Sequence, residues 1–271
     1  MIYSLDGVSK NFSERRGDVH ALQGVTLKVQ PGETLALLGP SGAGKTTLFR
    51  LLNGTLRPTA GTVVFDGTNT LALSGSELRV MRRRVGTIYQ QHNLVPSLTV
   101  FENALCGALG RMSFAATLKS MIRPSKPDVD RTVHALELVG LSDKRYARAD
   151  ELSGGQQQRL AVARVLVQSP DVILADEPTA SLDPTLSEDI TALLVGIARE
   201  GKKTLIMAVH KVELALRHFP RAVGLREGEL SFDVPASDVD PALLGTLYSR
   251  DAGSTGLPDG EHFQFKLGCA R

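Results

Sequence analysis

Short, almost entirely apolar runs recur along the chain, and each ends where polar or glycine residues begin. Residues 34–38 lead into a glycine-rich loop, residues 172–175 stop at Asp176, and residues 204–209 stop at His210. Runs of this kind predict strands buried on both faces, as in a parallel sheet covered by helices. Ligands of such sheets bind at the carboxyl ends of the strands. The pattern therefore predicts an α/β core with its chemistry at these ends.

Further elements are predicted on both sides of these runs. Residues 1–36 indicate short β segments separated by turns, and residues 62–65 indicate a strand that ends in a hairpin-type turn. Residues 45–52 have helical composition and stop at an Asn-Gly pair. The middle of the chain indicates mostly helix, with helices predicted at 100–109 and 129–139.

The pattern of hydrophobic and polar positions becomes irregular in two places. Residues 113–127 indicate an irregular excursion between the two middle helices. Near the C-terminus, residues 241–249 predict a short helix, and residues 251–260, rich in Gly, Ser, Pro and Asp, predict a loose segment. We assign no chemistry to this last part.

Composition limits the classes of function. The chain has 271 residues, of which 42% are hydrophobic and 22% charged, with a net charge of +2, which is typical of a globular protein and does not predict a nucleic-acid partner. The arginine run at 82–84 is read as a solvated helix end. Cys106 and Cys269 lack the spacing of a zinc site or a disulfide framework, which favours a reducing compartment. No segment has the pattern of a secretory signal or the roughly twenty apolar residues of a membrane span, so we expect any membrane role to come through a partner.

The glycine-rich loop at 39–46 fits the pattern G-x-x-x-x-G-K-[ST] between a predicted strand and a predicted helix. Glycines let the backbone amides surround phosphates without Cβ clashes, and the helix N-terminus adds a favourable dipole. We expect Lys45 to contact the β and γ phosphates of a nucleotide and the Thr46 hydroxyl to hold Mg²⁺.

Two adjacent acids, Asp176 and Glu177, follow the predicted strand at 172–175. An acid at the end of a buried strand can reach the magnesium shell, so Asp176 is the candidate metal ligand, and Glu177 is the candidate for polarising the attacking water. Taken alone, adjacent acids at a strand end favour an ordinary solvated turn. The phosphate-binding loop reverses that preference.

A second phosphate-binding turn, Leu-Ser-Gly-Gly-Gln at 152–156, precedes a helix-like run that continues through Val167. The Ser153 hydroxyl and the glycine amides at a helix start can bind a terminal phosphate. A Ser-Gly-Gly triplet alone indicates a flexible turn or a helix cap. The pentapeptide with its following glutamines is far more specific.

Together these motifs make residues 1–235 resemble the ATP-binding cassette (ABC) family. The resemblance implies a P-loop NTPase fold: an α/β core with a mixed sheet, an N-terminal antiparallel β subdomain and an inserted helical subdomain at about 91–170. Residues 236–271 would form a C-terminal extension, a short helix and then a flexible segment. The resemblance also implies a dimer that encloses ATP and Mg²⁺, in which the 152–156 turn of one subunit completes the site on the other's phosphate loop.

The family's motif positions imply a role for each candidate site residue. Glu177, His210 and Gln90 are implied as catalytic residues, and Thr46, Gln90 and Asp176 as ligands of Mg²⁺. The ATP contacts implied within one chain are Phe12, Gly39, Pro40, Ser41, Gly42, Ala43, Gly44, Lys45, Thr46 and Thr47. The ATP contacts implied across the dimer are Ser153, Gly154, Gly155, Gln156 and Asp183.

Some of these residues have simpler interpretations outside the family. Phe12 reads equally as an ordinary strand aromatic, Asp183 as a helix cap, and His210 as a structural histidine after a strand. Gln91, which follows Gln90, leaves the register of that motif open.

A narrower resemblance concerns the transported solute. Residues 102–110, 113–114 and 209–217, with Leu247 and Tyr248, look like the ATP-binding subunit of bacterial phosphonate importers. Residues around 56–67 look instead like the cassettes of lipoprotein-release and macrolide exporters. An importer implies permease subunits in the membrane, a periplasmic solute-binding protein as an indirect partner, and a peripheral position on the cytoplasmic face of the inner membrane. DNA-repair and chromosome-organising ATPases separate the same motifs by a long coiled coil, and no sustained heptad pattern occurs here. We therefore expect a transport ATPase.

Overall fold

Two sheets organise the part of the chain that this computed structural model describes, namely residues 1–14, 17–91, 93–112, 117, 123–180 and 182–248. The larger sheet is mixed and has the strand order β10-β9-β3-β8-β7-β6, and the smaller antiparallel sheet has the order β2-β1-β4-β5. The strands are β1 (Tyr3–Glu14), β2 (Gly17–Val29), β3 (Thr34–Leu38), β4 (Ala60–Phe65), β5 (Thr68–Asn69), β6 (Val85–Ile88), β7 (Val172–Ala175), β8 (Thr204–Ala208), β9 (Arg221–Arg226) and β10 (Glu229–Pro235).

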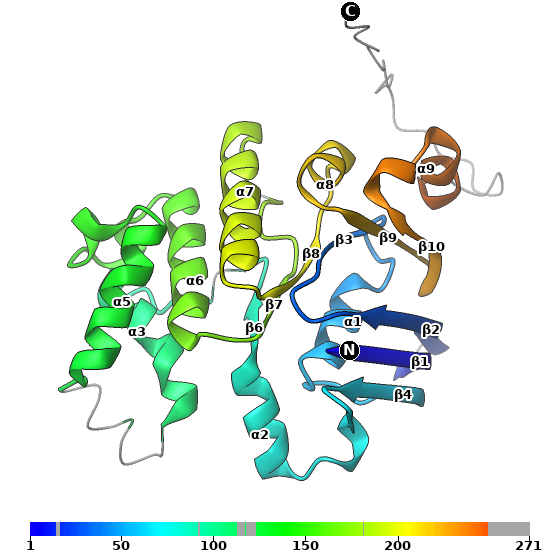
Figure 1. The fold of residues 1–271 in the computed structure, drawn as a ribbon, viewed down its shortest axis with the longest axis horizontal. Coiled ribbons are helices and arrows are strands. Elements are labelled where there is room, and N and C mark those ends of the chain that lie inside the picture. The colour runs from blue at the N-terminus through cyan, green and yellow to red at the C-terminus, as the bar shows by residue number, and fades with distance from the viewer. Residues whose placement is uncertain (15–16, 92, 113–116, 118–122, 181, 249–271) are drawn as a thin grey trace, which may run out of the picture.

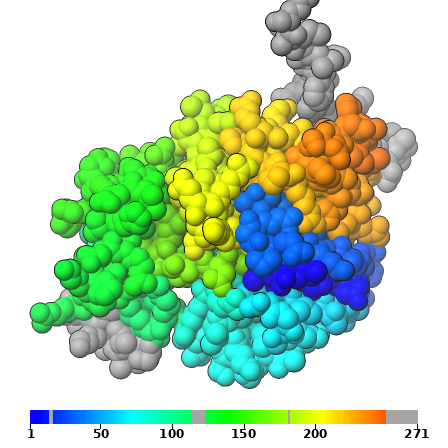
Figure 2. Space-filling model, in the orientation of Figure 1, coloured from blue at the N-terminus to red at the C-terminus, as the bar shows by residue number. Residues whose placement is uncertain are grey.

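Helices cover the mixed sheet and extend to one side of it. Figure 1 shows α3, α5 and α6 on the side of the mixed sheet away from the small antiparallel sheet, and Figure 2 shows this green region packed against the rest of the molecule. The helices are α1 (Lys45–Leu52), α2 (Gly75–Arg84), α3 (Val100–Leu105), α5 (Lys126–Leu138), α6 (Gly154–Gln168), α7 (Pro184–Glu200), α8 (Val212–His218) and α9 (Pro241–Tyr248), with short 3-10 turns at Thr70–Ala72, Cys106–Arg111, Ser142–Lys144, Ala149–Glu151 and Ala236–Asp238. Within the described ranges, none of the helices combines the length and the apolar character that a membrane crossing requires.

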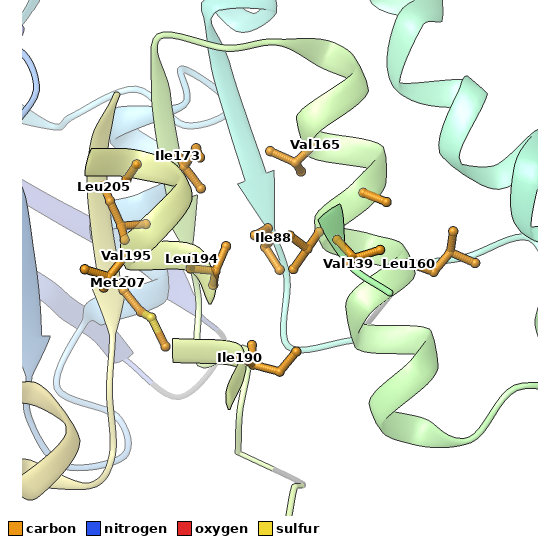
Figure 3. Close-up of a cluster of buried hydrophobic side chains, with 14 of the residues drawn as sticks. Ile88, Val139, Leu160, Val165, Ile173, Ile190, Leu194, Val195, Leu205 and Met207 are labelled. Atoms are coloured by element: carbon orange, nitrogen blue, oxygen red, sulfur yellow. The ribbon is translucent and has the colours of Figure 1, made fainter. Parts of the chain in front are cut away.

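The central strands are buried on both faces, as their apolar runs predict. In β3, Leu35 and Leu37 face a core shared with the antiparallel sheet, whereas Ala36 and Leu38 face a second core beneath α6 and α7. Strands β7 and β8 alternate between the two cores in the same way. Figure 3 shows the second core, where side chains of the sheet meet those of the two helices. Each fully buried aliphatic side chain stabilises the fold by about 1.5–3 kcal/mol. These strands therefore support the residues that follow their carboxyl ends.

The helix at 45–52 has the predicted bounds, and Gly54 ends it with a φ of 68°. The helix predicted at 100–109 is shorter, because α3 ends at Leu105 and the chain continues as the 3-10 turn Cys106–Arg111. Gly107 in that turn lies against α6, where a Cβ atom would meet the backbone oxygen of Arg164 at 2.0 Å. This close approach sets the packing of the turn on α6.

Three other expectations differ from the structure. The N-terminal β segments are not short, because β1 and β2 pair along most of their length and absorb register shifts in the ladder. The strand predicted at 62–65 begins at Ala60. Residues 126 and 127 belong to α5, which Ser125 caps through the N–H of Asp128, rather than to the excursion. Most of that excursion, with the loose segment at 251–260, lies outside the described residues; α9 confirms the short C-terminal helix.

Candidate functional site

The phosphate-binding loop connects the end of β3 to the start of α1. Gly42 and Gly44 have φ angles of 81° and 103°, which side chains rarely adopt. A Cβ atom on Gly44 would lie 2.5 Å from the backbone oxygen of Ala21, so this position also requires glycine for space. The loop therefore brings backbone amides to the positive end of α1, a geometry that suits a phosphate.

Lys45 is the first residue of α1, and its ammonium lies inside the loop. The side chain is only 4% exposed, and Nζ donates hydrogen bonds to the carbonyls of Gly39 at 2.7 Å and Pro40 at 3.0 Å. Nζ also lies 3.1 Å from Oε1 of Glu177. These contacts hold the positive charge of Lys45 at the carboxyl ends of β3 and β7.

Glu177 contacts residues that follow two other strands, Lys45 after β3 and His210 after β8. It follows β7, has a φ of 50°, and its Oε2 lies 2.6 Å from Nε2 of His210, which follows β8. Burial of this carboxyl opposes its ionisation, but the hydrogen bond from His210 and the nearby charge of Lys45 together hold the pKa of Glu177 below its ordinary value. The carboxylate is therefore ionised at neutral pH, as a residue that polarises water must be.

Asp176 has the opposite environment although it is the adjacent residue. It is buried, and burial raises the pKa of Asp176 while a hydrogen bond with the Thr46 side chain acts to lower it. A buried carboxylate beside a hydroxyl oxygen offers the hard oxygen ligands that Mg²⁺ prefers, and a bound cation would offset the cost of burying the charge. The pair Thr46 and Asp176 therefore fits the predicted metal site.

Gln90, the third predicted metal ligand, lies two residues beyond the end of β6 and is exposed. Its side chain makes no hydrogen bond within the described part of the chain. The backbone is nevertheless tied to the site, because β6 pairs with β7 and the N–H of Asp176 donates to the carbonyl of Ile88 at 2.9 Å. The register beside Gln91 stays open.

The turn at 152–156 forms the start of α6. Ser153 is the N-cap: its Oγ accepts from the N–H of Gln156 at 3.4 Å, and its N–H donates to Oε1 of Gln156 at 3.1 Å. Gly155 is buried against α7, where a Cβ atom would meet Cδ2 of Leu186 at 2.2 Å, whereas a Cβ atom on Gly154 would have no neighbour within 4 Å. The Ser153 cap and the packing of Gly155 on α7 fix the shape of this helix N-terminus, whereas Ser153 and Gly154 stay exposed.

Asp183 caps the neighbouring helix, as its simpler interpretation predicts. Its Oδ1 accepts from the N–H of Leu186 at 2.9 Å, at the start of α7. Within the described ranges, no hydrogen bond or ion pair joins this residue or the 152–156 turn to the cluster of Lys45, Glu177 and His210. The structure thus brings together the loop and strand-end candidates and keeps the candidates for contact across a dimer apart from them.

Phe12 lies on β1, opposite Val19 of β2, and is half-buried. The ammonium of Lys10 lies 5.2 Å from the centre of its ring. Of the other loop candidates, Ser41 and Ala43 lie on the turn between β3 and α1, and Thr47 lies in the first turn of α1.

One contact at this site was not predicted. The sequence predicts that Lys45 contacts phosphates and that Glu177 polarises water, and it contains no sign that the two side chains pair at 3.1 Å. This contact does not follow from local spacing, because the two residues come from distant parts of the chain.

Comparison with known proteins places this geometry in a family. A family model described as ABC transporter matches residues 22–180. This chain belongs to the ABC transporter family. Its mixed sheet, antiparallel sheet and helices confirm the predicted P-loop NTPase fold.

Individual relatives agree with this membership. The chain is 46% identical to the phosphonates import ATP-binding protein PhnC of Alcaligenes faecalis over 236 residues, which cover 87% of this chain and 84% of that protein. The protein of the same name from Anaeromyxobacter dehalogenans is 47% identical over 238 residues, covering 88% of this chain. Those residues are 47% of that relative, so this chain spans about half its length. A dimeric post-hydrolysis structure of the ATP-binding cassette MJ0796, bound to ADP and Pi, is similar with a TM-score of 0.73 and 32% identity, covering 86% of this chain and 98% of the other.

Proposed function

We propose that this protein is the ATP-hydrolysing subunit of an ABC importer for phosphonates or related phosphorus oxyanions. The observation that carries the proposal is the convergence of Lys45, Glu177 and His210 at neighbouring strand ends, with separations of 3.1 and 2.6 Å. ATP hydrolysis requires a cation that binds the phosphates and an ionised carboxylate that polarises the attacking water. Lys45 and Glu177 supply these groups, and His210 contacts Glu177.

Each residue has a separate task in the proposed reaction. The amides of the loop and the Lys45 ammonium bind the β and γ phosphates, and Phe12 stacks on the adenine. Glu177 orients and polarises the attacking water, and His210 contacts the γ phosphate. Thr46, Asp176 and Gln90 would hold Mg²⁺, which would neutralise charge on the phosphate oxygens.

The second half of the site is proposed to come from another copy of this chain. Ser153, Gly154, Gly155, Gln156 and Asp183 would contact the ATP bound to the partner's loop. The related cassette MJ0796 is described as dimeric and bound to ADP and Pi, which supports this arrangement. Because the γ phosphate would contact both chains, its presence favours the closed dimer and its loss favours opening.

The direction of transport and the solute rest on the relatives. Proteins 41–47% identical to this chain are named phosphonates import ATP-binding proteins, which supports import over export. The partners would be membrane permease subunits that dock on the helical lobe at about 91–170, with a periplasmic solute-binding protein acting through them. The subunit would then be peripheral at the cytoplasmic face of the inner membrane.

The substitution Glu177→Gln tests the proposed hydrolysis. We expect ATP turnover to fall roughly 10²- to 10⁴-fold while ATP binding is retained, because the substitution removes a general base and leaves the phosphate contacts in place. We also expect the variant to dimerise with ATP, measured by size-exclusion chromatography. Turnover within a few-fold of the wild type would rule out the assigned base.

The chain offers a matched control for that experiment. Glu188 on α7 also pairs with a histidine, since its Oε1 lies 2.6 Å from Nε2 of His218. The variant E188Q therefore removes a carboxylate from an equally short histidine pair away from the loop. We expect its turnover to equal that of the wild type.

A further inference from the structure

The Lys45 ammonium is fully paired within the chain itself. A lysine ammonium has three N–H donors, and Nζ of Lys45 lies within hydrogen-bond distance of three oxygen acceptors. These are the carbonyls of Gly39 at 2.7 Å and Pro40 at 3.0 Å, and Oε1 of Glu177 at 3.1 Å. The side chain is buried, so water hardly competes for these donors. A phosphate that binds this ammonium must therefore replace one of the three acceptors.

The three acceptors are not equally free to move. Gly39 and Pro40 belong to the loop itself, and Gly39 is packed so closely on β9 that a Cβ atom would approach the backbone oxygen of Leu225 to 2.2 Å. Releasing either carbonyl would require a change in the backbone of the loop that surrounds the phosphate. Glu177 comes from a separate segment after β7, and rotation about its side-chain bonds is enough to withdraw the carboxylate. Glu177 is therefore the acceptor that a phosphate displaces.

Charge favours the same exchange. A nucleotide phosphate carries at least as much negative charge as a carboxylate and binds cations through strong, charge-assisted hydrogen bonds. If Glu177 stayed on the ammonium, its carboxylate and the phosphate would share one cation at close range, and like charges repel strongly where little water screens them. The phosphate then keeps the ammonium, and the carboxylate is driven away from it.

The same pair also occupies the candidate base. Oε1 of Glu177 faces Lys45, and Oε2 lies 2.6 Å from Nε2 of His210, so each carboxylate oxygen has a partner in the chain. A general base must present an oxygen to the attacking water. Separation from Lys45 makes Oε1 available for that contact, whereas the bond to His210 can persist and orient the carboxylate.

We propose that the nucleotide phosphate replaces Glu177 on the Lys45 ammonium, and that this exchange releases the Glu177 carboxylate for the attacking water only when the loop is occupied. The Lys45–Glu177 pair then lowers the affinity for nucleotide and keeps the base away from water until a substrate arrives. This inference rests on the proposed function, because it describes the regulation of the same site.

The first test measures nucleotide affinity in the full-length protein by fluorescence titration with MANT-ADP in EDTA. ADP carries the β phosphate that Lys45 is expected to bind, and EDTA removes any contribution of a metal at Asp176. We expect E177Q to lower the dissociation constant about three- to tenfold, because the ammonium holds a neutral amide less strongly than a carboxylate. The matched control E188Q removes a carboxylate from a histidine pair away from the loop and should leave the dissociation constant unchanged.

The variant K45A separates displacement from simple repulsion between Glu177 and phosphate. K45A alone should weaken ADP binding, because it removes the ammonium. If Glu177 competes for that ammonium, E177Q should tighten ADP binding when Lys45 is present and should change it by less than about twofold in the K45A background. A gain of equal size in both backgrounds, or no gain with Lys45 present, overturns the exchange.

Crystal structures of the wild-type protein provide a test that needs no variant. Without nucleotide we expect Nζ of Lys45 and Oε1 of Glu177 to form the ion pair, and with ADP we expect these atoms to lie more than about 4 Å apart, beyond the range of an ion pair. A pair that persists beside the bound β phosphate, or that does not form without nucleotide, overturns the inference.

The outcomes distinguish this inference from the proposed function. If the wild type binds MANT-ADP and hydrolyses ATP but E177Q binds MANT-ADP no more tightly, the exchange is wrong and the ATPase assignment stands. If the wild type neither binds MANT-ADP nor hydrolyses ATP, both proposals fail.

Discussion

Replacing Gly155 with alanine tests how the 152–156 turn is held in place. The added Cβ atom would lie 2.2 Å from Cδ2 of Leu186, which is closer than carbon atoms tolerate, and 3.3 Å from its Cγ, which is a tight contact. Leu186 is the residue whose N–H is capped by Asp183, so its displacement would disturb the first turn of α7 as well as the start of α6. The substitution therefore acts on two of the elements predicted to face a partner chain.

The magnitude follows from two opposing effects. Overpacking of this kind costs about 1–3 kcal/mol, and replacing glycine by alanine within a helix returns about 0.5–1 kcal/mol. With the middle of each range, the expected net loss is about 1 kcal/mol in the free energy of unfolding, or a melting temperature lower by about 2–4 °C for a protein of this size. Thermal unfolding and urea titration of the nucleotide-free protein measure both quantities.

The adjacent glycine provides the control. A Cβ atom on Gly154 would meet nothing within 4 Å, so G154A should be as stable as the wild type or slightly more stable. The double variant G155A/L186A should lose less stability than the two single variants together, because the smaller side chain makes room for the new methyl group. Full stability of G155A, or strict additivity in the double variant, would refute the packing argument.

Two other predictions concern a helix contact and a titrating acid. G107A should destabilise the protein by more than about 2 kcal/mol in urea unfolding, because its Cβ would clash with a backbone oxygen at 2.0 Å, whereas Gly110 has open space and G110A should be neutral. Burial raises the pKa of Asp176 above its ordinary 3.8, so the ionised form destabilises the nucleotide-free fold, and D176N should unfold less readily at pH 7 in EDTA. That advantage should shrink as the pH falls below the raised pKa of the folded state and disappear well below 3.8, where the carboxyl is protonated in both states; an equal or lower stability of D176N at pH 7 would contradict the raised pKa.

The parts of the fold that could be predicted are those with a local signal. Strands β3, β7 and β8 are short apolar runs buried on both faces, and no alternative element accounts for such a pattern followed by polar residues. Helix α1 lies between the glycine at its start and the Asn-Gly pair at its end, and its bounds follow from these residues.

Other elements begin with cap residues, of which only the Asp183 cap entered the prediction from the sequence. Helix α2 begins with a capping box of Ser74 and Glu77, and α7 begins with the Asp183 cap followed by a proline at its first turn. These caps predict helix starts, but the hydrophobic runs alone do not reveal them. The length of the N-terminal hairpin depends on pairing between β1 and β2, which single-strand patterns do not contain.

For the candidate site, the sequence predicts which residues take part but not how they contact one another. The candidate residues could be named, because each follows a loop or a strand of recognisable composition. Their mutual contacts could not, because they depend on β8 lying between β3 and β7 in the sheet. That order places the residues following β7 and β8 beside each other, and it is what allows Glu177 to meet both Lys45 and His210.

The structure of the 152–156 turn suits the role proposed for it, that of a second phosphate-binding element in the chain. Its shape is fixed within the chain, by the Ser153 cap on one side and by the packing of Gly155 on Leu186 on the other. The first amides of a helix have no partner inside that helix, and together with the dipole they attract an anion. In the described part of the chain the loop at 39–46 has its own helix, α1, for that purpose, so the turn at α6 is suited to a phosphate brought by another molecule. A stable G154A variant that binds ATP but no longer hydrolyses it would therefore locate the defect at the proposed contact between two copies.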